Sequence, residues 1–304
     1  MKAVFIDATG ALADIFDRLH KSDDIPLIVN QQVDITPDQI PGVMGDANIM
    51  IVDHTNLPTD IAKRCTHLKH VVFLGTGARS YMNPEALAEI GIQVHIIKGY
   101  GDTAVAECAF ALMWEAAKGF AKMDRGVRRG QWLRTEGLQL TGKTLGLIGF
   151  GGIAAEMARL ANGVGMQVLA WNRSPKTHAD VTFVELDELL AESRVISLHL
   201  LLNDETRGFI SADKISRMQD GVIVINTARG AVIDEVALID GLRSGKIGHA
   251  GLDVFDIEPL PVDHPLARLD NVTLSAHSAF RTPEASDNLI EASLAHCRRI
   301  AAAG

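Results

Sequence analysis

The segment from Thr144 to Ser174 constrains the fold of this chain more than any other. An apolar run, Thr144–Ile148, leads into a glycine-rich turn, and an alanine-rich stretch of helical length, Ile153–Asn162, follows it. A second short apolar run, Val168–Trp171, comes next. Apolar runs of this kind are typical of buried parallel strands, so the segment predicts a βαβ unit.

The glycine turn of this unit matches the dinucleotide-binding fingerprint G-x-G-x-x-G/A. Gly149 makes the tight turn, Gly151 lets the phosphates approach the backbone, and Ala154 stands at the third position. A glycine-rich hairpin or helix cap gives the same letters, but neither explains the strand before the turn and the helix after it. We therefore expect a pyrophosphate at the amino end of the helix, bound by Gly149, Gly151, Gly152 and Ile153.

The end of the second strand indicates which dinucleotide is bound. An NAD-binding unit usually has an Asp or Glu there, which accepts hydrogen bonds from the ribose hydroxyls. This chain has Asn172, Arg173 and Ser174 instead, with Lys176 close behind. A carboxylate would repel the 2′-phosphate of NADP, whereas these residues supply donors and positive charge. The sequence therefore favours NADP(H); the alternative is that Arg173 is an ordinary solvated loop arginine.

Length and composition favour a two-domain enzyme of a reducing compartment. A chain of 304 residues exceeds what one hydrophobic core usually serves, and 47% hydrophobic residues are enough for two cores. The formal net charge of -9 and the pI near 5.6 argue against nucleic acid and anionic membranes as partners. Cys65, Cys108 and Cys297 form no CxxC pair, and the first ten residues lack the apolar core of a signal peptide. We expect a cytoplasmic protein without a membrane span.

Short apolar strands alternate with helical stretches along the whole chain, which predicts an α/β fold of two Rossmann-like domains with parallel sheets. The expected strands before and after the fingerprint are Ala3–Ile6, Leu27–Val29, Ile49–Val52, His70–Leu74, Gln93–Ile96, Val195–Leu200, Val222–Asn226, His249–Asp253 and Val272–Ser275.

Helix boundaries are marked most clearly by capping residues. Asn83, Asp234 and Thr282 each stand where a side chain can cap the first turn of a helix. Thr103 to Lys122 has the composition of one long helix, and a basic, turn-rich segment, Arg125–Gly142, leads from it into the fingerprint.

Charged side chains follow three of the later strands, at the point where each strand ends. Arg229 follows the strand before it by three residues, Glu258 follows a strand that ends at Asp253, and His277 follows the last strand. The carboxyl ends of parallel strands line the ligand crevice of an open α/β sheet. An arginine there can clamp a carboxylate, and a histidine beside a carboxylate can shuttle a proton. Each residue alone has a structural alternative, as an ion pair, a solvated turn residue or a strand-end histidine, but their succession behind a cofactor fingerprint indicates one catalytic site.

Several long motifs follow one another over nearly the whole chain, and together they are far more specific than a glycine fingerprint. They are GTG at 75–77, GKTLGLIGFGGIA at 142–154, SLHL at 197–200, ETRGFI at 205–210, NTARGAVIDEVAL at 226–238, GLDVFDIEPLP at 251–261 and AHSAF at 276–280. In these motifs the chain resembles the D-isomer-specific 2-hydroxyacid dehydrogenase family, in particular its glyoxylate/hydroxypyruvate reductase-like members. The resemblance implies a substrate domain made of residues 1–99 and 283–304, a cofactor domain, residues 100–282, inserted into it, and catalysis in the cleft between them.

The same resemblance implies a role for each matching residue. Arg229 would bind the substrate carboxylate and polarise the keto group, His277 would donate or accept the proton, and Glu258 would be the partner of His277. The backbone amides of the GTG loop would bind the other side of the carboxylate. The remaining contacts that it implies are Gly77 and Ala78 to the substrate and Thr227 and Asp253 to the cofactor, with Asp253 near the nicotinamide carboxamide.

Some positions depart from the family pattern. Cys108 stands where many members have histidine, and Leu201 and Leu202 replace a proline-containing turn, so the cofactor contacts of that turn do not transfer. Arg79 follows the GTG loop where an acid or Asn is common, and it is either a second substrate contact or part of an ion pair within its own domain. His54 matches a position that faces the cleft in relatives, which makes it a candidate substrate contact.

We therefore expect NADPH-dependent reduction of a small 2-oxo acid, such as glyoxylate or hydroxypyruvate, to the D-2-hydroxy acid. The enzyme would be a homodimer built on the cofactor domain, with Trp132 at a domain or subunit surface. The alternative function is an NADP(H)-binding regulatory or sensor protein of the same fold without significant turnover, against which the three charged strand-end residues argue. No metal is expected, because His67 and His70 lack a third ligand nearby.

Overall fold

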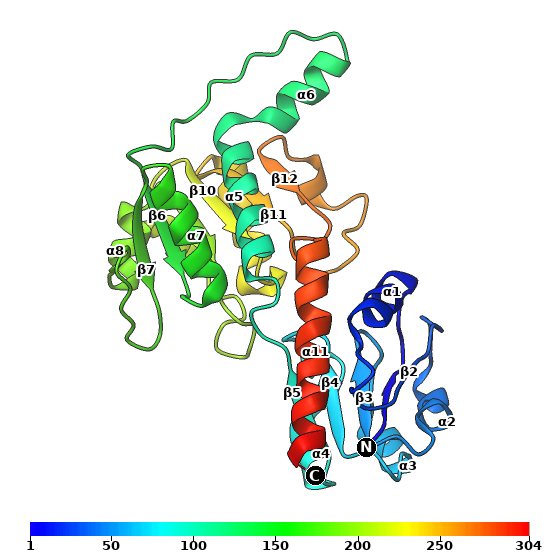
Figure 1. The fold of residues 1–304 in the computed structure, drawn as a ribbon. Helices are drawn as coiled ribbons and strands as arrows, with labels where there is room; N and C mark the ends of the chain where they lie inside the picture. The colour runs from blue at the N-terminus through cyan, green and yellow to red at the C-terminus, as the bar shows by residue number, and fades with distance from the viewer. Residues whose placement is uncertain (304) are drawn as a thin grey trace. The chain divides into compact units, whose positions relative to one another are not determined.

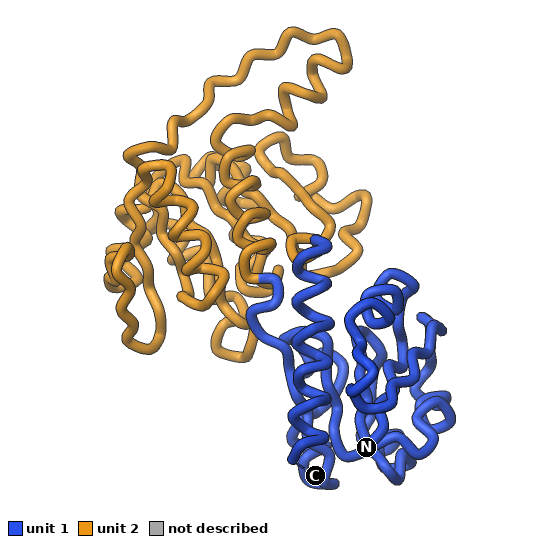
Figure 2. Tube along the Cα trace, viewed as in Figure 1, with its two compact units in different colours: residues 1–101, 281–304 blue, residues 102–280 orange. Residues whose placement is uncertain are grey.

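The computed structural model of the protein describes residues 1–303, so Gly304 of the expected substrate domain lies outside the described residues. The chain divides into two compact units, coloured separately in Figure 2. Unit 1 contains residues 1–101 and the chain from Arg281 on, and unit 2 contains residues 102–280. Unit 2 is therefore inserted into unit 1 along the sequence, and both divisions fall two residues from the positions expected from the sequence.

The sheet of unit 1 has five parallel strands in the order β2-β1-β3-β4-β5. The order reverses between β1 and β3, and ligands of open parallel sheets bind beyond the carboxyl ends of the strands at such a switch point. The elements are β1 (Ala3–Phe5), α1 (Gly10–Leu19), β2 (Leu27–Val29), η1 (Pro37–Gln39), α2 (Ile40–Met44), β3 (Ile49–Val52), α3 (Thr59–Arg64), β4 (His70–Phe73), η2 (Ala78–Ser80), α4 (Pro84–Glu89), β5 (Gln93–Ile96) and α11 (Pro283–Ala303).

Helices cover both faces of this sheet, because side chains of a strand alternate between its two faces. On one face Met50 packs in a buried cluster with Ile40 of α2 and Ile61 of α3. On the other face Phe5 packs with Phe16 of α1, at 5.1 Å between ring centroids, in a cluster that also holds side chains of α11. Unit 1 is thus a three-layer α/β/α unit to which the far end of the chain contributes a helix.

The sheet of unit 2 has seven parallel strands in the order β12-β11-β10-β9-β6-β7-β8. The order reverses between β6 and β9, as in dinucleotide-binding folds. The elements are α5 (Asp102–Lys118), α6 (Phe120–Arg128), β6 (Thr144–Ile148), α7 (Gly152–Gly163), β7 (Gln167–Trp171), β8 (Thr182–Phe183), α8 (Leu186–Glu192), β9 (Val195–Leu198), α9 (Ala212–Arg217), β10 (Val222–Asn226), η3 (Gly230–Val232), α10 (Glu235–Ser244), β11 (Ile247–Leu252), η4 (Pro265–Arg268) and β12 (Val272–Leu274).

The middle strand β10 shows why both faces of this sheet are covered. Ile223 and Ile225 pack in the cluster that includes α5 and α7. Val222 and Val224 pack in the opposite cluster, with α8, α9 and α10. Together with unit 1, this arrangement confirms the predicted α/β fold with two parallel sheets.

The capping residues begin helices where the sequence predicts. Asn83, Asp234 and Thr282 each accept a hydrogen bond from the backbone amide three residues further on, at 3.0, 3.1 and 3.1 Å. These bonds satisfy amides that have no acceptor inside the helix. Within residues 1–303, no helix is long and apolar enough to cross a membrane.

The prediction of one long helix over Thr103 to Lys122 was wrong. The first helix, α5, ends at Lys118, and Gly119 adopts a left-handed conformation with φ of 68° before α6 begins. Because glycine reaches positive φ without steric cost, it ends the first helix and redirects the second. The segment Arg125–Gly142, expected to be turn-rich, accordingly starts within α6.

Candidate active site

The fingerprint turn lies at the switch point of unit 2. Gly149 follows β6 with φ of 85°, and a Cβ atom on it would lie 2.7 Å from the carbonyl oxygen of His199, which follows β9. A side chain would therefore separate the two strand ends. The backbone amide of Gly149 also donates to Trp171 O at 2.9 Å, which joins the turn to β7. Glycine at this position keeps the three strand ends close together.

The amino end of α7 fits the pyrophosphate of a dinucleotide. Gly151 precedes the helix, and no side chain of residues 1–303 caps the helix there. A Cβ atom on Gly151 would meet no other atom within 4 Å, so the space beside the first amides is open. The hydroxyl of Thr227, at the end of β10, is buried without a hydrogen-bond partner in the described structure. Such a buried orphan group is consistent with a ligand contact.

The residues expected at the 2′-phosphate are partly engaged with each other and with neighbours. Asn172 accepts from the amide of Phe150 at 3.1 Å and donates to Ser174 O at 2.8 Å, which fixes the turn after β7. The Arg173 guanidinium forms an ion pair with Glu205. Both side chains are largely exposed, 74% and 70%, so the guanidinium remains open to an exchange of partner.

Arg229 follows β10 on a turn that is held by Asn226. The side chain of Asn226 accepts from Ala228 N at 3.0 Å and donates to Arg229 O at 2.9 Å. Asn226 is buried, whereas Arg229 is half-buried. The sequence did not identify Asn226 as a positioning residue, although a polar residue that ends an otherwise apolar strand is a signal for one.

His277 and Glu258 are hydrogen-bonded. Nδ1 of His277 lies 2.6 Å from Oε2 of Glu258, and Oε1 of Glu258 accepts from the amide of Phe255 at 2.9 Å. One carboxylate therefore holds both the imidazole and the backbone after β11. Nε2 of His277 has no hydrogen-bond partner within residues 1–303, so it is the ring nitrogen available to a substrate.

Asp253 holds the loop that carries His277. Its buried carboxylate accepts from Ser275 Oγ at 2.6 Å and from the amides of Ser278 and Ala279, both at 3.0 Å. The backbone amide of His277 donates to Asp253 O at 2.8 Å. His277 has φ of 47°, in the left-handed region that residues other than glycine seldom adopt, and the contacts around the loop hold it there.

Backbone packing brings the Arg229 turn and the Glu258 loop together. A Cβ atom on Gly230 would lie 2.0 Å from the carbonyl carbon of Phe255, so these two backbones are in direct contact. Phe255 in turn donates to Glu258, which holds His277. The three charged residues expected to act together are therefore linked through two backbone segments at one edge of the sheet.

In unit 1, the loop after β4 presents backbone amides. Within residues 1–303, the amides of Gly77 and Ala78 donate to no acceptor, and Ala78 begins the short η2 helix. Arg79 forms a two-bond ion pair with Glu85, which is the structural alternative that the sequence left open. To contact the substrate, Arg79 would have to leave Glu85 and bind the substrate carboxylate instead.

His54 lies at the switch point of unit 1 and has partners on both ring nitrogens. Nδ1 lies 3.2 Å from Asp53 Oδ2, and Nε2 lies 3.1 Å from Val33 O. Although partial burial opposes it, the carboxylates of Asp7 and Asp53 raise the pKa of His54 above its ordinary value. Asp7 was not identified from the sequence; its buried carboxylate accepts three consecutive backbone amides, from Asp53 to Thr55, and fixes this loop.

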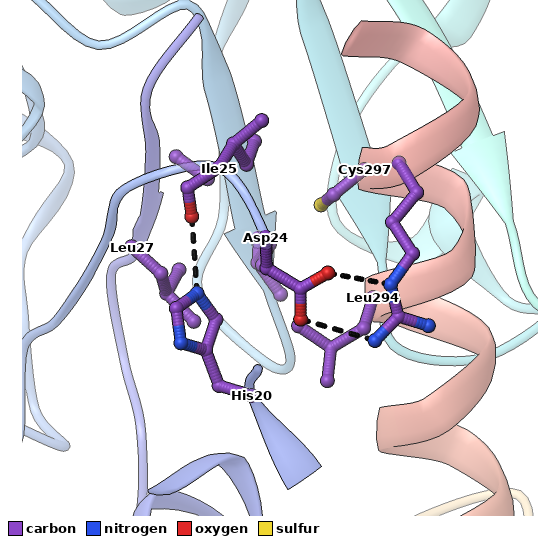
Figure 3. A pocket seen from close by; sticks show the side chains of 9 residues that line it. His20, Asp24, Ile25, Leu27, Leu294 and Cys297 are labelled. Carbon is purple, nitrogen blue, oxygen red and sulfur yellow. Dashed lines mark hydrogen bonds and ion pairs between the residues drawn. The ribbon is translucent and has the colours of Figure 1, made fainter. Parts of the chain in front are cut away.

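Cys108 makes none of these hydrogen bonds, and the cavity that lies among them is small. It measures about 10 Å³ and is lined by Asn226, Gly230 and Phe255. Burial, with a smaller contribution from the Asp253 carboxylate, raises the pKa of Cys108 to about 11, so its thiol is protonated at neutral pH. A cavity of about 360 Å³ lies at the opposite, amino edge of the unit 2 sheet, beside Arg194, Gly221 and Asn271. In unit 1 a cavity of about 10 Å³ lies beside Asp24 and Cys297 (Figure 3), too small for a substrate.

Comparison with known proteins identifies the family. The model for "D-isomer specific 2-hydroxyacid dehydrogenase, NAD binding domain" matches residues 110–279, more than half of the chain. The chain therefore belongs to the D-isomer-specific 2-hydroxyacid dehydrogenase family, as its motifs predict. It is a nicotinamide-dependent enzyme of this family, with the family's fold.

Individual relatives match over most of their length. The hydroxypyruvate reductase of Thermotoga maritima is 38% identical over 255 residues, which are 82% of this chain and 83% of the relative. A glyoxylate reductase of Aeropyrum pernix is 35% identical over 238 residues, 74% of this chain and 71% of the relative. The solved structure of an acyclic imino acid reductase in complex with NADPH and D-Arg is similar with a TM-score of 0.84 and 27% identity, covering 100% of this chain and 97% of that one.

Proposed function

We propose that this enzyme reduces a small 2-oxo acid, such as glyoxylate or hydroxypyruvate, to the D-2-hydroxy acid with NADPH. The observation that carries the proposal is the hydrogen bond of 2.6 Å between His277 and Glu258, on loops joined to the Arg229 turn. The names of the relatives from Thermotoga maritima and Aeropyrum pernix support the substrate class.

The chemistry assigns a separate task to each group. The bound nicotinamide supplies a hydride for the keto carbon. His277 donates a proton from Nε2 to the keto oxygen, while Glu258 holds Nδ1 and compensates the positive charge of the ring before the transfer. The guanidinium of Arg229 binds the substrate carboxylate, and the free amides of Gly77 and Ala78 bind its other side. In the reverse direction, neutral His277 accepts the proton of the hydroxyl group.

The preference for NADPH is proposed from the turn after β7. Arg173 and Ser174 replace the acid that would bind ribose hydroxyls, and Asn172 shapes the turn instead. Arg173 would leave Glu205 and pair with the 2′-phosphate. The exposed ion pair with Glu205 is worth only about 0–1 kcal/mol, so little is lost when Arg173 leaves it. A phosphate offers more acceptor oxygens and more negative charge than one carboxylate, which favours the exchange.

His54 and Arg79 keep their proposed roles as substrate contacts on one condition. Each has a protein partner, Val33 O or Glu85, that a bound carboxylate would have to replace. Thr227 and Asp253 are proposed to face the nicotinamide end of the cofactor. The orphan hydroxyl of Thr227 supports this placement, and Asp253 would act mainly by holding the His277 loop.

We also propose a homodimer built on unit 2. In Figure 1, α6 and the chain that follows it project from the rest of this unit. The projecting segment exposes large apolar side chains, 57% of Phe120, 53% of Val127 and 79% of Trp132. Apolar side chains of this size commonly mark a protein interface. Light scattering should give a dimer mass that Trp132→Ser reduces to a monomer mass; a monomeric wild type would contradict the proposal.

The function is tested by NADPH oxidation over a panel of 2-oxo acids, with NADH alongside. We expect turnover with small substrates and a kcat lower by about a hundredfold to ten-thousandfold in His277→Ala, the range of general acid–base catalysis. NADPH binding should remain in this variant, because the fingerprint lies elsewhere. Tight NADPH binding without turnover on any substrate would favour the regulatory or sensor protein instead.

A further inference from the structure

The carboxylate of Asp102 lies where a side chain at position 152 would stand. Asp102 is the first residue of α5, and Gly152 is the first residue of α7. A Cβ atom on Gly152 would lie 1.7 Å from Asp102 Oδ2. The amino ends of the two helices are therefore side by side, and a negative charge from one lies against the first residue of the other.

This place is the edge of the expected pyrophosphate site. The first amides of a helix have no acceptor inside it and attract anions. In α7 they are left uncapped by the described side chains, and the space at Gly151 is open. A pyrophosphate that binds to the backbone from Gly151 to Ile153 would therefore come close to the Asp102 carboxylate.

Nothing in the described structure compensates this carboxylate. It accepts no hydrogen bond and forms no ion pair within residues 1–303. Burial first, and the nearby carboxylate of Glu156 second, raise the pKa of Asp102 above its ordinary value. Its ionised form is thus disfavoured before any ligand arrives, which is unlike a carboxylate that stabilises the fold.

We propose that Asp102 sets the affinity for the cofactor by opposing the pyrophosphate. Like charges a few Å apart repel, and the repulsion acts on NADH and NADPH alike because both carry the same pyrophosphate. A weaker complex releases the spent cofactor faster. The inference rests on dinucleotide binding by unit 2 and not on the proposed preference for NADPH.

The test is direct titration of purified Asp102→Asn with NADH and NADPH, followed by nicotinamide fluorescence. The variant keeps the shape and removes the charge, so Kd for both dinucleotides should fall by about three- to tenfold at low salt. The gain should shrink at high salt, since ions screen the repulsion. Adenosine, which lacks phosphate, should compete equally well in wild type and variant. Glu192→Gln, an exposed charge change at the end of α8, is the control and should leave every Kd unchanged.

An unchanged or higher Kd in Asp102→Asn would overturn the proposal; a higher value would mean that Asp102 accepts a hydrogen bond from the cofactor. If Asp102→Asn folds poorly, Asp102→Ser provides the same comparison. A parallel gain in adenosine affinity would also overturn it, because the effect would then be structural. Equal use of NADH and NADPH by the wild type would contradict only the proposed cofactor preference.

Discussion

Oε2 of Glu258 lies 2.6 Å from Nδ1 of His277, and the second oxygen of the same carboxylate is bound to the backbone amide of Phe255. Glu258 thus accepts from two donors at once. One bond sets the tautomer and orientation of the imidazole, and the other attaches the carboxylate to the end of β11. Glu258, which is itself held by the Phe255 amide, therefore fixes the direction in which the reactive nitrogen Nε2 of His277 points.

Glu258→Gln should lower kcat by about ten- to a hundredfold, with a smaller change in KM. In glutamine an NH2 group, which only donates, replaces one of the two carboxylate oxygens, so in the same orientation the side chain cannot accept from both Phe255 N and His277 Nδ1. It also removes the charge that compensates protonated His277. Steady-state kinetics in both directions measures the effect. Asp256→Asn, a neighbouring exposed charge change, is the control, and equal losses in the two variants would contradict the specific role of Glu258.

Asp253→Asn should lower the free energy of unfolding of unit 2 by about 1–3 kcal/mol, because at least one of the three donors that its carboxylate binds loses its acceptor. The loop of residues 275–279 should also lose protection in hydrogen exchange, and kcat should fall with it. Asp263→Asn changes an exposed acid and should stay within about 0.5 kcal/mol of the wild type. A stable Asp253→Asn protein with an unprotected loop would still support the positioning role; a protein with unchanged loop protection would not.

The strands and capped helices could be predicted because each depends on local sequence. Asn83, Asp234 and Thr282 cap helices within their own first turn, and runs such as Val222–Asn226 are apolar because both faces of the strand are buried. The break at Gly119 could not be predicted in the same way, because strong helix formers stand on both sides of it: Ala116, Ala117 and Lys118 before and Ala121, Lys122 and Met123 after. Strand β8 has only two residues and exists through pairing with β7.

In the site, residues at strand ends could be predicted, and their partners from other elements could not. The sequence places Arg229 and His277 at one edge of a parallel sheet through strand order alone. It does not show that Glu205 pairs with Arg173, which lies 32 residues away, or that Asp102 lies against Gly152. Such contacts depend on how helices and loops pack in three dimensions.

Arg173→Gln should lower kcat/KM for NADPH by about tenfold or more and leave that for NADH nearly unchanged, the size of one lost charge-assisted contact. Glu205→Gln should act in the opposite direction, because it releases the guanidinium for the 2′-phosphate. The ratio of kcat/KM values for the two cofactors measures both effects.

The double variant Arg173→Gln/Glu205→Gln tests whether the two residues act through each other. Its cofactor ratio should equal that of Arg173→Gln, since Glu205 has no effect without the arginine. An increase of NADPH use in the double variant over Arg173→Gln would show that Glu205 repels the phosphate independently. Equal ratios in the wild type and Arg173→Gln would refute the assignment of Arg173 to the 2′-phosphate.

The ion pair between Asp24 and Arg298 predicts that unit 1 loses stability in acid. Arg298 of α11 binds Asp24 through two hydrogen bonds, Nε to Oδ1 at 2.6 Å and Nη2 to Oδ2 at 3.0 Å (Figure 3). The hydrogen bonds from Arg298 lower the pKa of Asp24 from 3.8 to about 2. A lowered pKa means that the pair stabilises the fold fully above about pH 4 and that this contribution disappears as pH falls through about 2.

Asp24→Asn should therefore lower the stability of unit 1 at neutral pH by about 1–2 kcal/mol, and this difference from the wild type should narrow as pH falls from about 4 towards 2. Hydrogen exchange of α11 and of residues 20–30 reports on this unit separately, which matters because the two units need not unfold together. Asp287, which is also on α11, pairs with Arg18 of α1 and is more exposed than Asp24. Asp287→Asn should therefore cost less than about 1 kcal/mol of stability. A difference between Asp24→Asn and wild type that stays constant from pH 6 to pH 2 would show that shape, and not the charge of Asp24, accounts for its contribution.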